Sequence, residues 1–240
     1  MIYVIDIPGP WHQSAGVRAL HVLKSELQAR GLEAVMSYEG GFSLDDAYVL
    51  YPEVTPGNPR RAARWGTWML NLRGPLPPGE RFAWWSMISH DPLLAVNVIE
   101  SHLWWPQPRR TNTVGVWEGK GRIDWSKCPP GAVQITHKSH PTREGLSDFV
   151  RSLDSLVSFD PFSMMNLEAA CAGVPVRIFE DGKWTREQVE SIGWMPFGAA
   201  WEDDEMPEAR ASVHLARSFY FDKIVPLFGD QIDRFVRLTS

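Results

Sequence analysis

The stretch Leu156–Val176, LVSFDPFSMMNLEAACAGVPV, carries the strongest fold signal in the sequence. It starts with the apolar run Leu156–Phe159, which is typical of a strand buried on both faces. Ser163 is a favourable cap for the helix that follows, and Gly173 is a favourable stop for it. A second apolar strand is predicted at Pro175–Phe179. Strand, helix and strand in this order indicate an α/β fold with a parallel sheet.

The same alternation is predicted along the rest of the chain. Further strands are expected at Tyr3–Ile7, Glu33–Met36, Asp46–Pro52, Arg81–Ile88, Thr113–Trp117 and Ala132–Thr136. Helices are expected from Gly16 to Gly31 and at Arg60–Leu72, Asp91–His102, Thr142–Ser152, Ser163–Ala172, Arg186–Ser191 and Glu208–Phe228. The last of these helices is expected to bend near Pro226, because proline lacks the backbone N–H that a helix interior needs.

The size of the chain allows one large domain or two small ones. It has 240 residues, of which 44% are hydrophobic and 22% charged, and this balance excludes a disordered, collagen-like or coiled-coil protein. We expect an N-terminal domain at residues 1–110 and a C-terminal domain at 111–215, with a polar, proline-bearing linker at 105–113. A C-terminal helix follows at 216–240. In one arrangement, this helix packs back on the N-terminal domain.

Composition also bears on location and partners. No apolar run approaches the roughly 20 residues that span a bilayer, so we expect no integral membrane association. Cys128 and Cys171 are too few for a disulfide framework or a cysteine zinc site, which favours a cytoplasmic setting. His137 and His140 lack suitable partners, and no metal site is expected. The net charge of −5 argues against a general nucleic-acid coat but leaves a local basic groove open.

The helix that begins at Ser163 has the features of a phosphate site. Backbone N–H groups in a first helical turn have no partner within the helix and favour an anion. Glu168 lies further along the same helix, where a carboxylate can accept hydrogen bonds from two ribose hydroxyls. One helix could therefore hold both a diphosphate and a ribose.

The spacing of Asp160 and Glu168, followed by Glu-Ala-x-x-x-Gly-x-Pro-Val, resembles a known motif. It is similar to the acidic-x7-Glu motif of retaining, nucleotide-sugar-dependent glycosyltransferases of the GT-B fold. The resemblance implies two Rossmann-like domains that face each other across a cleft. It also implies that Glu168 binds the donor ribose and that the backbone N–H groups of Ser163 and Met164 bind the diphosphate. Asp160 stands where the family commonly has glutamate and would contact the transferred sugar.

Other segments resemble the family in the same order. Ser14, Ala15 and Gly16 resemble the first strand-to-helix loop, which approaches donor and acceptor. Gly119-Lys120-Gly121 resembles the loop that opens the donor domain, and implies that Lys120 neutralises the leaving diphosphate. A Tyr-Pro-Glu…Gly-Asn-Pro…Arg-Trp pattern over residues 51–65 resembles one bacterial and phage subgroup. The acceptor-binding candidates in and around this pattern are Asn58, Arg60 and Arg64, and His90 is a further candidate for contacting the sugar or the acceptor hydroxyl.

The implied activity is transfer of a sugar, with retention, from a nucleotide-diphosphate sugar such as a UDP-sugar to an acceptor hydroxyl. No Asp-x-Asp metal motif occurs, so Lys120 and the helix start, with Lys138 or Arg143 as a second cation, would meet the leaving charge without metal or cofactor. The acceptor is either a surface glycan or a hydroxymethylated base in phage DNA. The alternative is a sugar-nucleotide or nucleic-acid binding protein of the same fold without catalysis.

The arginine and tryptophan residues bear on whether the acceptor is a glycan or a DNA base. The N-terminal half contains most of the tryptophans, nine of the 12 lying in the first 125 residues. The residues that would suit a base-stacking, basic surface are Arg60, Arg61, Arg64, Arg109, Arg110, Trp65, Trp68, Trp104 and Trp105. Tryptophan stacks on sugar rings as well as on bases, so composition leaves both acceptors open.

Overall fold

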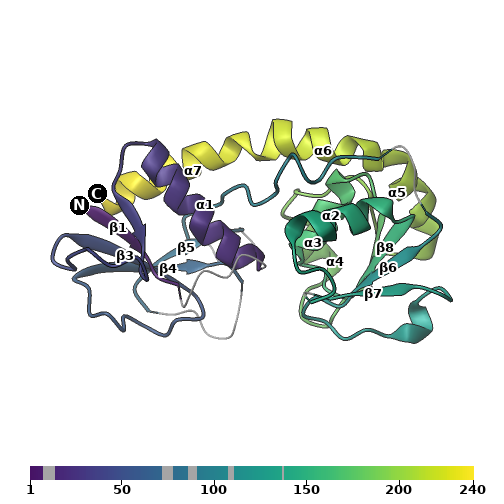
Figure 1. The fold of residues 1–240 in the computed structure, drawn as a ribbon, viewed down its shortest axis with the longest axis horizontal. Helices are drawn as coiled ribbons and strands as arrows, with labels where there is room; N and C mark the ends of the chain where they lie inside the picture. Colours follow the sequence, from purple (N-terminus) through teal and green to yellow (C-terminus); the bar gives the residue numbers. More distant parts are fainter. Residues whose placement is uncertain (8–13, 72–77, 86–90, 108–110, 137) are drawn as a thin grey trace. The chain divides into compact units, whose positions relative to one another are not determined.

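The computed structural model of the chain describes residues 1–7, 14–71, 78–85, 91–107, 111–136 and 138–240. It divides into two compact units (Figure 1). The N-terminal unit contains Met1–Val98 and Val225–Ser240, and the C-terminal unit contains Ile99–Ile224. The boundary therefore precedes the expected one at residue 110, and the segment that rejoins the first unit starts at Val225 rather than at residue 216. Part of the expected linker, residues 108–110, lies outside the described residues.

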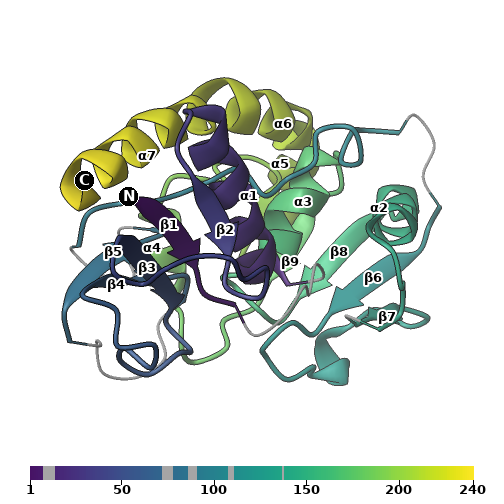
Figure 2. The same cartoon turned by 60° about the vertical axis from the view of Figure 1, so that its left-hand side comes forward.

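The N-terminal unit is built on five parallel strands in the order β2-β1-β3-β4-β5. They are β1 (Ile2–Ile5), β2 (Ala34–Met36), β3 (Ala47–Pro52), β4 (Arg64–Met69) and β5 (Glu80–Ala83). The helices of this unit among its described residues are α1 (Ala15–Ala29) and α7 (Pro226–Thr239). Arg30, which follows α1, forms an ion pair with Asp233 of α7 at 2.7 Å, so the two helices are neighbours (Figure 2).

The two faces of this sheet are covered differently. On one face, alternate residues such as Val4, Val49 and Tyr51 pack against apolar side chains of connecting loops, including Phe42 and Leu44. On the other face, three aromatic rings of the strands meet one ring of α7. These rings belong to Tyr3, Tyr48, Phe82 and Phe235. The C-terminal helix is thus part of the core of the N-terminal unit.

Two helix predictions in this unit are wrong. Arg60–Leu72 contains strand β4 instead, since its aromatic and β-branched side chains suit a sheet and Gly66 weakens a helix. A side chain at Gly66 would overlap the Tyr48 hydroxyl, so the sheet itself needs glycine there. Asp91–His102 contains no helix; Leu93 instead bridges to Ala83 beside β5. Pro92 and this pairing hold the segment extended.

The C-terminal unit has a second sheet of five parallel strands in the order β10-β9-β8-β6-β7. Its strands are β6 (Val114–Trp117), β7 (Val133–Ile135), β8 (Ser155–Ser158), β9 (Val176–Ile178) and β10 (Ala199–Ala200). Its helices are α2 (Arg143–Ser152), α3 (Met164–Cys171), α4 (Arg186–Glu190), α5 (Met206–Ser212) and α6 (Ala216–Phe219). Short 3₁₀ turns at Trp125–Lys127, Asp203–Glu205 and Val213–Leu215, and a π turn at Tyr220–Ile224, complete the unit.

The C-terminal unit matches the sequence predictions closely. Every strand and helix expected between residues 113 and 191 is present, with bounds that differ by one or two residues. The expected helix at Glu208–Phe228 is a series of helical turns, and Pro226 is the first residue of the separate helix α7. The chain is therefore a mixed α/β protein with two parallel sheets, an arrangement compatible with two Rossmann-like domains. Within the described ranges, no helix is long and apolar enough to cross a membrane.

Candidate functional site

The candidate site lies where the connections of the second sheet change direction. Strand β6 pairs with β7 on one side and with β8 on the other. In open parallel sheets, ligands bind at the carboxyl ends of such a strand pair, because the loops diverge there and leave a crevice. The loops at this point are Glu118–Gly121 after β6 and Phe159–Ser163 after β8. Both contain residues that the sequence singled out.

The Gly119-Lys120-Gly121 loop is packed directly onto Asp160. The backbone N–H of Lys120 donates a hydrogen bond to Oδ2 of Asp160 at 3.0 Å. Gly119 has a φ of +57°, and a side chain there would overlap the Asp160 carboxylate. A side chain at Gly121 would overlap the carbonyl oxygen of Phe159. Both glycines are therefore required for this close approach, and the Lys120 side chain extends from a fixed backbone.

This packing predicts a strong effect of Gly121→Ala. The added methyl group meets backbone rather than a flexible side chain, so the loop must move, and we expect a loss of about 3 kcal/mol in the free energy of unfolding. Urea unfolding of the C-terminal unit measures this loss. Gly131→Ala is the control, because nothing lies near that position and only its φ of +78° opposes a side chain, at a cost of about 1 kcal/mol. Equal losses in the two variants would contradict the packing described.

Asp160 is a buried carboxyl group with 5% of its surface exposed. Burial raises its pKa, and the hydrogen bond and charge of Lys120 oppose this only in part. The peptide groups around it are held by Asn166, whose Nδ2 donates to the carbonyl oxygens of Asp160 and Pro161 at 3.0 and 3.2 Å. The loop that carries Asp160 is therefore anchored on both sides, by Lys120 and by Asn166.

The raised pKa of Asp160 predicts a pH-dependent effect of Asp160→Asn. The folded protein binds this proton more tightly than the unfolded chain, so the contribution of Asp160 to stability is present below the ordinary pKa of 3.8 and is lost as pH rises through the raised value. Asparagine does not ionise, so the variant does not lose stability in this way as pH rises. Its side-chain oxygen can still accept a hydrogen bond from the backbone N–H of Lys120. We therefore expect the variant to gain stability relative to the native protein between about pH 4 and about pH 7.

Urea unfolding at the two pH values tests this expectation. Asp204→Asn serves as the control, because Asp204 is exposed and lies in another loop of the same unit. If the stability difference between Asp160→Asn and the native protein does not change with pH, the effect of burial on Asp160 is not as described.

Ser163 caps α3 and also receives a hydrogen bond from the end of β6. Its Oγ accepts from the backbone N–H of Met165 at 3.3 Å and from the indole Nε1 of Trp117 at 2.9 Å. Two donors use both lone pairs of a hydroxyl oxygen, so the Ser163 proton remains to be donated. The hydroxyl proton and the first backbone N–H groups of α3 are the donors that an anion would meet.

Glu168 lies in α3 with 2% of its surface exposed, and Arg143 of α2 binds it. The two Arg143 Nη atoms lie 2.6 and 3.4 Å from its two carboxylate oxygens. Arg143 also donates from Nη2 to Glu100 at 2.8 Å, and its guanidinium lies over the ring of Trp104. Burial alone would lower the pKa of Arg143, but the two carboxylates outweigh it and raise that pKa. Arg143 is thus held between two glutamates, which differs from the role of a cation directed at a diphosphate. The ribose role of Glu168 remains a prediction.

The described candidate residues of the N-terminal unit fall into three groups. Asn58 and Arg60 lie together: Asn58 Oδ1 accepts from the Tyr51 hydroxyl at 3.0 Å, and Arg60 pairs with Asp6 at 2.8 Å. Arg64 lies elsewhere, at the amino end of β4, where it donates to the carbonyl oxygen of Thr239.

The third group lies at the start of α1. Ser14 is the residue before α1, and Ala15 and Gly16 are its first two residues. His90 lies outside the described residues. Asn58 also binds both the N–H and the carbonyl of Ala62, so it stabilises a turn in addition to any contact with acceptor.

Three residues of the site were missed from the sequence, namely Trp117, Asn166 and Glu100. Trp117 ends β6, and a polar tip at a strand end is the signal that would have pointed to it. Among the described residues, no group of three histidine, cysteine, aspartate or glutamate side chains could hold a metal ion. No protein-family model and no curated protein matches the chain.

Proposed function

We propose that the protein is a retaining glycosyltransferase with two Rossmann-like domains of the GT-B type. It moves a sugar from a nucleotide-diphosphate sugar, such as a UDP-sugar, to an acceptor hydroxyl. The observation that carries this proposal is the packing of the Gly119-Lys120-Gly121 loop on Asp160, at the crossover of the second sheet. A cationic loop, a buried carboxyl group and a capped helix start meet there.

The chemistry requires stabilisation of the leaving diphosphate. Negative charge develops on the bridging oxygen as the bond to the sugar breaks, and fixed cations and N–H dipoles lower the energy of that state. The Lys120 ammonium and the donors at Ser163 and Met164 are suited to this role, and they need no metal ion. In a retaining reaction the acceptor attacks on the face that the diphosphate leaves, so closeness matters more than a strong base.

The other site residues have supporting roles in the proposal. Asp160 would contact the transferred sugar, and Glu168 would bind the donor ribose after its bond to Arg143 rearranges. Ser14, Ala15 and Gly16 would approach the donor from α1, while Asn58, Arg60 and Arg64 would contact the acceptor. His90 is the proposed contact for the sugar or the acceptor hydroxyl.

Nucleotide release tests the role of Lys120. We expect Lys120→Met to reduce release of UDP from a panel of UDP-sugars by about 100-fold, the cost of removing one group that stabilises transition-state charge. Lys127→Met is the matched control, because Lys127 is exposed in the same unit and pairs only loosely with Asp124, at 3.9 Å. Full activity of Lys120→Met would overturn the assignment. Binding of the donor without any turnover, including slow hydrolysis, would favour the non-catalytic alternative.

The acceptor is proposed as either a surface glycan or a hydroxymethylated base in DNA. Binding of duplex DNA separates the two, because contacts to phosphates weaken steeply as salt is added. A strong salt dependence supports a DNA acceptor. Absence of DNA binding at low salt excludes DNA as the acceptor and leaves the surface glycan.

A further inference from the structure

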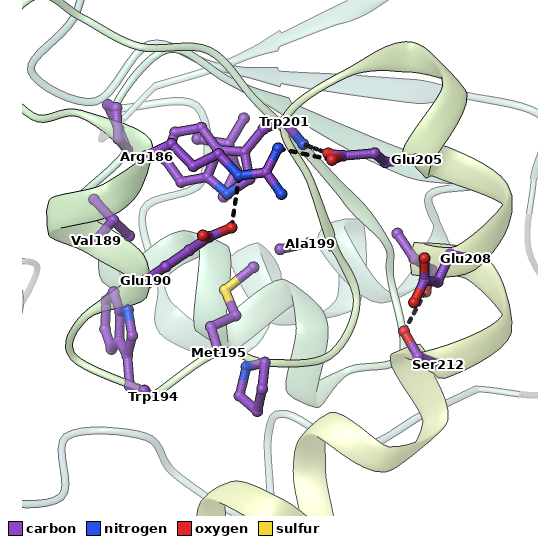
Figure 3. A pocket seen from close by; sticks show the side chains of 15 residues that line it. Arg186, Val189, Glu190, Trp194, Met195, Ala199, Trp201, Glu205, Glu208 and Ser212 are labelled. Atoms are coloured by element: carbon purple, nitrogen blue, oxygen red, sulfur yellow. Dashed lines mark hydrogen bonds and ion pairs between the residues drawn. The ribbon is translucent and has the colours of Figure 1, made fainter.

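A cavity of about 340 Å³ lies within the C-terminal unit, between α4 and α5 (Figure 3). Its walls come from both helices, from the loop before β10 and from the residues that follow β10. Pro161, in the loop after β8, and Ile178, the last residue of β9, also line it. The volume is in the range of sites that hold small molecules. The cavity contains none of the residues proposed for the donor site.

The inner wall of the cavity is apolar and aromatic. Trp194 and Trp201 line it while only 2% and 7% of their surfaces are exposed, so both rings are firmly packed. The ring of Phe162 lies 5.8 Å from that of Trp194 and supports it from behind. In Figure 3 the Met195 side chain extends into the space between the helices. These side chains would contact the apolar body of a ligand.

The polar residues of the cavity carry an excess of negative charge. Three glutamates, Glu190, Glu205 and Glu208, and one arginine, Arg186, line it, so three negative charges and one positive charge give −2. Arg186 pairs with Glu205 and with Glu190, each at 2.7 Å. Glu205 is held ionised, because the N–H of Trp201 and then Arg186 lower its pKa. The single charge of Arg186 is shared between Glu205 and Glu190, so two negative charges remain over Glu190, Glu205 and Glu208.

This combination selects a cation. A phosphate or carboxylate would be repelled by the excess charge, which separates the cavity from a nucleotide site. A cation gains from the glutamates and from the faces of tryptophan rings, which attract positive charge. We infer that the cavity is a binding site for a small organic cation, in which an ammonium or guanidinium group faces Glu190 and Glu208 and an aliphatic or aromatic body packs against Trp194 and Trp201.

Calorimetric titration of the full chain with phenethylammonium tests the inference. The neutral analogue 2-phenylethanol has the same ring and carbon chain, so the comparison isolates the charge. We expect saturable binding of the cation and at least tenfold weaker binding of the alcohol. Equal binding of both compounds, or no binding of the cation, would overturn the inference. This comparison uses the unaltered protein and so does not depend on the folding of any variant.

Variants then locate the site. We expect Glu190→Gln combined with Glu208→Gln to weaken phenethylammonium binding at least tenfold. Glu187→Gln is the control, because Glu187 is exposed on the same helix α4 but does not line the cavity. An equal loss in the control, or none in the double variant, would show that the cation binds elsewhere and would contradict the inference.

Discussion

The variant Phe235→Ala should lower the free energy of unfolding of the N-terminal unit by about 3–5 kcal/mol, the usual cost of removing a buried phenyl ring. Phe235 is 1% exposed. Its ring lies 4.8 Å from that of Phe82 in an edge-to-face arrangement and also contacts the rings of Tyr3 and Tyr48. The cavity left by alanine would be bordered by rigid rings from three strands, which leaves little room for collapse.

Amide hydrogen exchange resolves this effect by unit. We expect faster exchange in the strands of the N-terminal unit and little change in residues 99–224. Leu238→Ala is the control, because Leu238 lies on the same helix with 48% of its surface exposed and should cost well under 1 kcal/mol. Unchanged exchange in β1 and β3 of Phe235→Ala would contradict the inclusion of α7 in that core.

The partner of α7 illustrates what the sequence leaves open. Phe228, Ile232 and Phe235 recur at helical spacing and predict one buried face. That pattern does not identify the surface against which the face packs, because any apolar sheet face would satisfy it. The packing of α7 against β1 depends on particular contacts, such as the hydrogen bond between the hydroxyls of Tyr3 and Thr239 at 3.0 Å.

The accuracy of the secondary-structure predictions follows the strength of the local signal. The C-terminal unit has clear caps, such as Thr142 for α2 and Ser163 for α3, and its elements lie where they were expected. In the N-terminal unit, β4 and the segment after Asp91 were predicted as helices. There the sheet pairing of Arg64–Met69, which joins residues distant in sequence, decides the structure over the local pattern.

Part of the candidate site could also be predicted from the sequence. Asp160 and Lys120 were singled out by their resemblance to family motifs. Each also follows a predicted strand, and parallel strands bring such ends together. The hydrogen bond from Trp117 to Ser163 and the ion pairs of Arg143 were not found, since they depend on the rotation of strands and helices about their axes. Arg143 was one of two candidates, with Lys138, for a second cation at the diphosphate, and the sequence has no feature that distinguishes that role from pairing with Glu168.

Arg143 is the position at which a single substitution should affect the C-terminal unit most strongly. Its guanidinium is 14% exposed and pairs with Glu168, which is 2% exposed, and with Glu100, which is 28% exposed. Arg143→Met removes the cation that pairs with both carboxylates of this cluster and leaves their charge in a poorly hydrated site. Removing one member of a buried ion pair typically costs about 3–5 kcal/mol, and we expect a loss of that size.

A second substitution distinguishes this loss from simple loss of packing. Arg143→Met combined with Glu168→Gln should recover more than half of the loss at neutral pH, because the more deeply buried charge is then absent. Arg210→Met is the control, since Arg210 and its partner Asp154 are 45% and 35% exposed and such a pair contributes at most about 1 kcal/mol. Urea unfolding of the four proteins at neutral pH gives the comparison. A loss in Arg143→Met that Glu168→Gln does not reduce would show that the stem of Arg143, rather than its charge, stabilises the contact between α2 and α3.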